Sequence, residues 1–165
     1  MDARISARSA LPVDIFSRAT IDPNSGTGQY FHPDRLAAES LYLSIANLPG
    51  GRQINPKAFV ETDDANGNPV EGNAGRNSAR GFDAVQADMT LRRDFPFTER
   101  VGLQFRAEAY NLSNHPSFGS IRNTLDTGAL FGQAYTTLDS QLGGLSSIYQ
   151  IGGARSMQVS LKLHF

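Results

Sequence analysis

The sequence contains no cysteine and no tryptophan, only 19% of its residues are charged, and its net charge is −1. The absence of cysteine excludes disulfides and thiolate metal sites. No apolar run approaches the ~20 residues of a membrane-spanning helix, and residues 1–25 show no secretory signal. The near-zero net charge gives no electrostatic reason to expect a nucleic-acid partner.

Hydrophobic residues other than glycine make up 39% of the 165 residues, and the ~45–50% apolar content of typical globular domains includes glycine. The chain also contains 16 glycines, 8 prolines and many small polar residues. This composition favours strands and long polar loops over a helical bundle, and the length fits one domain.

The end of the chain shows the clearest pattern. Apolar and polar residues alternate over 155–165, as expected for a strand with one apolar and one polar face. The apolar positions are Met157, Val159, Leu161, Leu163 and Phe165. An apolar strand that runs to a terminal aromatic residue is unusual, because chain ends are normally polar and frayed.

Similar alternation predicts three more strands, over 82–95, 99–112 and, less regularly, 3–18. Pro12 lacks a backbone N–H, so we expect a bulge or a broken ladder there. The connection at 96–99 is a tight turn, whereas 19–80 and 113–154 are long. Both long connections fall on the same side of an antiparallel sheet, as in outer-membrane barrels with short periplasmic turns and long extracellular loops.

Two stretches of the long connections allow more than one interpretation. Residues 34–46 fit either a short helix or a short strand, which periodicity alone does not separate. Residues 63–68 have some of the composition of a calcium loop but not its ligand spacing, so a polar turn at Asn66 and Gly67 is favoured. The sequence has no catalytic, nucleotide-binding or metal motif. We therefore expect no enzyme activity, no cofactor and no metal.

Four stretches resemble the C-terminal barrel region of TonB-dependent outer-membrane receptors of the Oar-like type, which contain a carboxypeptidase-regulatory-like domain. They are 49–59 (PGGRQINPKAF), 75–82 (GRNSARGF), 98–119 (from TERV to NLSNHPSFG) and 149–156 (YQIGGARS) leading to Phe165. They occur in the order that the family shows, and together they cover much of 49–165.

The resemblance implies an all-β fold, namely an antiparallel transmembrane β-barrel fragment of about four strands with long extracellular loops. Such receptors have an N-terminal plug and a twenty-two-stranded barrel, so we expect this chain to be the end of a longer receptor or the product of a truncated gene. The implied location is the outer membrane of a Gram-negative bacterium. The implied partners are the rest of the barrel, the plug, TonB, outer-membrane lipid and the barrel-assembly machinery, which would recognise the strand that ends at Phe165.

Polar residues on two of the predicted strands are candidates for the wall of a transport lumen: Gln104, Arg106, Glu108, Gln158 and Lys162. The same pattern fits an ordinary solvated strand face. A soluble β-rich binding module, such as a carbohydrate-binding sandwich, is the alternative for the whole chain. It would have a thin core, because only three clean apolar faces serve the 165 residues.

Overall fold

A computed structural model describes residues 1–21, 27–138 and 152–165. The chain divides into two units. Unit 1 comprises Met1–Ser9, Asp83–Ser117 and Thr137–Phe165, and unit 2 comprises Ala10–Phe82 and Phe118–Thr136. Within the described ranges, no helix is long and apolar enough to cross a membrane.

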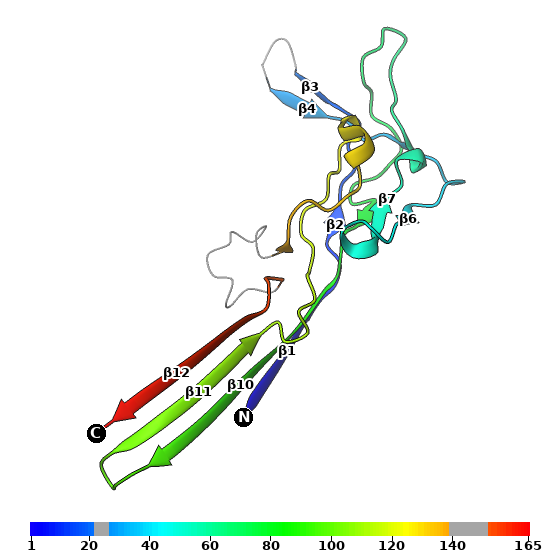
Figure 1. Ribbon diagram of the computed structural model, residues 1–165. Helices are drawn as coiled ribbons and strands as arrows, with labels where there is room; N and C mark the ends of the chain where they lie inside the picture. Colours follow the sequence, from blue (N-terminus) through cyan, green and yellow to red (C-terminus); the bar gives the residue numbers. More distant parts are fainter. Residues whose placement is uncertain (22–26, 139–151) are drawn as a thin grey trace. The chain divides into compact units, whose positions relative to one another are not determined.

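Unit 1 is built on a four-stranded antiparallel sheet in the order β1-β10-β11-β12 (Figure 1). Its strands are β1 (Asp2–Arg8), β10 (Ala84–Pro96), β11 (Gly102–Tyr110) and β12 (Ser156–His164). The last three follow closely the spans that alternation predicts. A tight turn joins β10 to β11, where the Thr98 hydroxyl accepts hydrogen bonds from the N–H groups of Arg100 and Val101 at 3.3 and 3.0 Å.

Asn111 fixes the direction in which the chain leaves β11. Its φ of +52° lies in the left-handed region that asparagine tolerates. The residue is 2% exposed, and its side-chain amide donates to the carbonyls of His115 and Gly153 at 3.2 and 2.8 Å. Its backbone N–H donates to the Asp88 carboxylate at 3.0 Å, which ties this corner to β10.

Unit 2 consists of short paired strands and 3-10 turns. The strands are β2 (Pro12–Val13), β3 (Ala19–Ile21), β4 (Gly28–Tyr30), β5 (Asp34–Arg35), β6 (Tyr42–Ser44), β7 (Arg52–Ile54), β8 (Phe59–Val60) and β9 (Ala79–Arg80). They form the antiparallel pairs β2-β9, β3-β4, β5-β8 and β6-β7. The 3-10 segments are η1 (Pro49–Gly51), η2 (Pro56–Ala58) and η3 (Leu125–Leu130).

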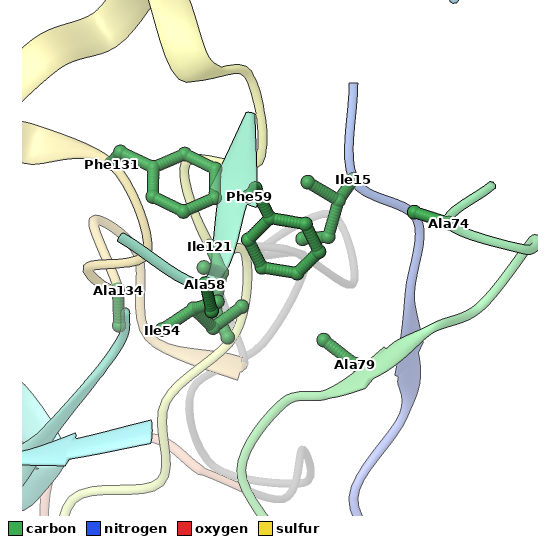
Figure 2. Close-up of a cluster of buried hydrophobic side chains, with 9 residues drawn as sticks. All are labelled: Ile15, Ile54, Ala58, Phe59, Ala74, Ala79, Ile121, Phe131 and Ala134. Atoms are coloured by element: carbon green, nitrogen blue, oxygen red, sulfur yellow. The ribbon is translucent and has the colours of Figure 1, made fainter. Parts of the chain in front are cut away.

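A hydrophobic cluster holds unit 2 together, and Figure 2 shows its nine side chains converging from separate stretches of the chain. They are Ile15, Ile54, Ala58, Phe59, Ala74, Ala79, Ile121, Phe131 and Ala134. The rings of Phe59 and Phe131 meet edge to face with centroids 6.1 Å apart, a favourable aromatic geometry. The two long connections are therefore not independent loops, because each supplies part of one core.

The stretch 49–59 lies at the centre of this unit. Gly50 has a φ of +72°, and a Cβ there would overlap the Phe82 ring. The Arg52 guanidinium stacks on the rings of Tyr42 and Phe82, 4.7 and 4.9 Å from their centroids. Gln53 is buried and donates to the Phe131 carbonyl at 2.6 Å. Gly50, Arg52 and Gln53 belong to the stretch that resembles the receptor family. Each of them has a packing or hydrogen-bonding role within unit 2.

The structure corrects the strand expected over 3–18. The first strand of the sheet ends at Arg8, and the short β2 pairs with β9 in unit 2. Pro12 has no N–H to extend a ladder, and Ile15, which lies within the predicted span, is fully buried in the core of unit 2. Alternation continued past the end of the strand because core residues of unit 2 happen to follow the same period.

The two ambiguous stretches now have definite structures. Residues 34–46 contain β5 and β6 and no helix. Residues 63–68 form a polar turn in which Asp64 accepts hydrogen bonds from the N–H groups of Asn66 and Asn68, both at 2.8 Å. These hydrogen bonds lower the pKa of Asp64 below its ordinary value. Asp63 instead forms an ion pair with Arg18 at 2.8 Å.

Candidate functional site

The sheet of unit 1 has an apolar face that spans all four strands. Residues directly opposite each other in antiparallel strands lie on the same face, and the register aligns the odd-numbered positions of the four strands. Those on β12 are Met157, Val159, Leu161 and Leu163, and their neighbours on β11 are Ala109, Ala107, Phe105 and Leu103. The face continues through Leu91 and Met89 of β10 to Ala3 and Ile5 of β1.

This face is uncovered in the part of the chain that the structure describes. The four apolar residues of β12 are between 57% and 66% exposed, and Phe165 is 95% exposed. A soluble sandwich buries such a face against a second sheet, so the geometry disfavours the carbohydrate-binding alternative. Apolar side chains exposed along a whole face are instead expected where the surrounding medium is lipid.

The one charge on the apolar face lies near the turn between β10 and β11. Arg93 is opposite Phe105, and its guanidinium lies 5.8 Å from the centroid of the Phe95 ring. Phe97, in the turn itself, is 62% exposed. Near a membrane interface a charge costs only ~0–1 kcal/mol, and aromatic rings are typical of that zone.

The opposite face is polar and joined by hydrogen bonds. Glu108, which is 6% exposed, accepts from the Gln158 amide at 2.7 Å, the Arg106 guanidinium at 2.5 Å and the Tyr110 hydroxyl at 3.1 Å. Its carboxylate is therefore compensated, as a buried charge must be. Three of the five residues predicted for the polar wall, Arg106, Glu108 and Gln158, are in direct contact.

The other two predicted wall residues lie opposite each other one row away. Gln104 is paired in register with Lys162, and its amide donates to Asp94 at 2.8 Å. Lys162 has no hydrogen bond or ion pair within the described ranges. Asp94 was not among the predicted residues, although its place on the polar face of β10 follows from the alternation of that strand.

Residues at the other end of the polar face were also missed. Gln86 donates to Asp88 at 2.8 Å and accepts from the Gly152 N–H at 3.0 Å. These bonds connect β10 to the residues that precede β12. Of the resembling stretch 149–156, residues 149–151 lie outside the described residues.

Comparison with known proteins agrees with this two-faced sheet. A family model described as an outer membrane beta barrel domain matches residues 1–158. No curated protein and no solved structure matches the chain. The chain therefore belongs to the outer membrane beta barrel domain family, and its open antiparallel sheet is a segment of an outer-membrane barrel.

Proposed function

We propose that this chain supplies part of the barrel wall, extracellular loops and the C-terminal assembly signal of a TonB-dependent receptor in the outer membrane of a Gram-negative bacterium. The observation that carries the proposal is the sheet with one exposed apolar face and one hydrogen-bonded polar face. By resemblance to Oar-like receptors, the intact receptor imports a solute with energy coupled through TonB. No catalytic step is assigned to the chain.

The sheet edges support a larger barrel. β1 and β12 are the outer strands of the sheet, and no described residue pairs with their free edges. Lipid does not tolerate open edges, because each unpaired backbone group costs several kcal/mol there. In the proposal, further strands of the receptor cover both edges, and the polar face lines the interior of the barrel, which also holds the plug.

The order of the strands supports an orientation. The turn between β10 and β11 leaves one end of the sheet, and both long connections leave the other end. Short turns of outer-membrane barrels are periplasmic and long loops are extracellular. The proposal therefore places the two long connections on the extracellular side and the C-terminus at the periplasmic rim, where the barrel-assembly machinery would contact Phe165.

Thiol labelling tests the two faces. The chain has no cysteine, so Leu161→Cys and Ser160→Cys each introduce a single reactive group, on the apolar and the polar face. In isolated outer membranes, a charged maleimide should label the Ser160→Cys variant, and a lipid-soluble reagent should label the Leu161→Cys variant. Equal labelling of both variants by the charged reagent would contradict a lipid-facing sheet.

The TonB assignment needs a separate test. Cross-linking in living cells should join the full-length receptor to TonB, and the product should disappear from a strain without TonB. Correct insertion without any TonB cross-link would leave an outer-membrane barrel and remove the TonB-dependent part of the proposal.

A further inference from the structure

A cavity of about 280 Å³ opens on the polar face between β1, β10 and β11. Its lining residues are Asp2, Ala3, Arg4, Asp88, Thr90 and Tyr110. The register places Asp2 opposite Thr90 and Arg4 opposite Asp88. The polar side chains of three strands therefore surround one space, on the face that the proposed function assigns to the lumen.

The charged groups of this cavity have unused bonding capacity. Neither Arg4 nor Asp2 makes an ion pair or a side-chain hydrogen bond with any described residue. Asp88 uses Oδ1 to accept from Gln86 and Asn111 at 2.8 and 3.0 Å, which leaves Oδ2 open. Asp2 and Arg4 are exposed, so a ligand of complementary charge can reach both groups and form charge-assisted hydrogen bonds with them.

We propose that this cavity binds a small solute that carries both a carboxylate and an ammonium group, such as a free amino acid or a dipeptide. The Arg4 guanidinium presents a planar fork of donors that matches a carboxylate. Asp2 and Asp88 accept from the ammonium group, and the Thr90 hydroxyl is a further polar contact. The inference rests on the proposed function, because it requires the polar face to line a solute path.

The mixed charge of the lining narrows the ligand class. A purely anionic solute would meet two carboxylates, and a purely cationic one would meet Arg4. An apolar solute would leave all three charges without partners. The volume of about 280 Å³ is just below the ~300–1,000 Å³ of pockets for larger ligands, and therefore fits a molecule of one or two amino-acid residues.

The test measures binding of L-alanyl-L-alanine to the full chain, in the form assembled in outer membranes and extracted in mild detergent. N-acetylation of the dipeptide removes its ammonium group and C-terminal amidation removes its carboxylate. Each derivative should bind at least about tenfold more weakly, the loss expected for one charged hydrogen bond. Arg4→Gln should weaken binding of the dipeptide by a similar factor. It should also abolish the difference in affinity between the dipeptide and its amide.

Arg8→Gln is the matched control, since Arg8 is on the same strand and face but outside the cavity. It should leave the affinity unchanged. Assembled protein that does not bind the dipeptide, or that binds it equally after Arg4→Gln, would overturn the inference while the proposed barrel remains. Failure of the unmodified chain to enter the outer membrane would overturn the proposed function and this inference together.

Discussion

Arg92 and Arg106 lie directly opposite each other on β10 and β11. Like charges in this position repel. Each guanidinium binds a carboxylate two residues further along its own strand, Asp94 at 3.3 Å and Glu108 at 2.5 Å. Because the strands are antiparallel, these contacts draw the two guanidinium groups in opposite directions along the sheet.

Glu108→Ala should destabilise the sheet more than Asp94→Ala. The Glu108 side chain is 5% exposed and that of Asp94 is 50% exposed. Glu108→Ala removes the one carboxylate that accepts from Gln158, Arg106 and Tyr110 together, whereas Asp94 is exposed and its ion pair with Arg92 is screened by water. Urea unfolding of the assembled protein, followed by electrophoretic mobility without heating, measures the difference. Equal losses would show that Glu108 is no more important than a surface carboxylate.

Phe131→Ala should unfold unit 2 far more readily than Phe97→Ala. Phe131 is fully buried and packs on Phe59, while Phe97 is 62% exposed. Truncation of a buried phenylalanine costs about 3–5 kcal/mol. Under the proposed orientation, protease added to intact cells should cleave 27–80 rapidly in the first variant and slowly in the second. Slow cleavage in both would mean that the core does not control the stability of this unit.

Gly50→Ala and Gly51→Ala separate backbone strain from steric overlap. Their φ values, +72° and +67°, are both in the left-handed region, but a Cβ at Gly51 has nothing within 4 Å. Gly51→Ala should cost about 1–2 kcal/mol through backbone conformation alone. Gly50→Ala should cost more, because its Cβ would overlap the Phe82 ring. Thermal unfolding of the two variants measures the contribution of the ring, and identical midpoints would contradict the packing of Phe82 on Gly50.

Glu71 should make unit 2 sensitive to acid. Hydrogen bonds from the side chain and backbone of His32 lower the pKa of Glu71 below its ordinary 4.5. The stability that this carboxylate contributes is therefore complete above pH 4.5 and is lost as the pH falls through the lowered pKa. Glu71→Gln should reduce the slope of stability against pH in this acid range.

Glu39→Gln is the control for that measurement. Glu39 is exposed, and its carboxylate has no hydrogen-bond partner in the described part of the chain. The pH dependence of unfolding should be unchanged in this variant. The contact between His32 and Glu71 would have no bearing on acid stability if Glu71→Gln behaved in the same way.

Deletion of Phe165 should sharply lower assembly of the full-length barrel protein into the outer membrane. The residue is 95% exposed and continues the apolar face of β12, so its loss removes surface without disturbing a core. Phe95→Ala, on the same face of β10, is the control and should leave assembly largely intact. Normal surface levels after the deletion would remove the assembly-signal part of the proposal.

The alternation of single strands was enough to predict the faces of the sheet. On β11 and β12, the apolar and polar positions could be assigned without any long-range information, because side chains alternate strictly along a strand. The sequence could predict that Glu108 and Gln158 lie on the same polar face, but not that they are in contact. The actual pairing depends on the register of two segments separated by a long connection.

The core of unit 2 could not be predicted in this way. Ile54 lies between Gln53 and Asn55, and nothing periodic marks it as buried. It becomes so through the approach of Phe131 and Ala134 from the other long connection. The alternation in the sequence placed the end of the first strand too late for a related reason. Ile15 fits the two-residue period of a strand, but its side chain belongs to the core of unit 2.

The hydrogen bond from Gln53 to Phe131 spans 78 residues of sequence, and this separation sets an order on folding. A chain that has emerged only as far as β11 lacks Ile121, Phe131 and Ala134, so unit 2 cannot close until the later connection has also arrived. Contacts of such long range form slowly. During secretion, the unfinished unit exposes Ile15, Ile54 and Phe59, and protection by a holding chaperone would be needed over that interval.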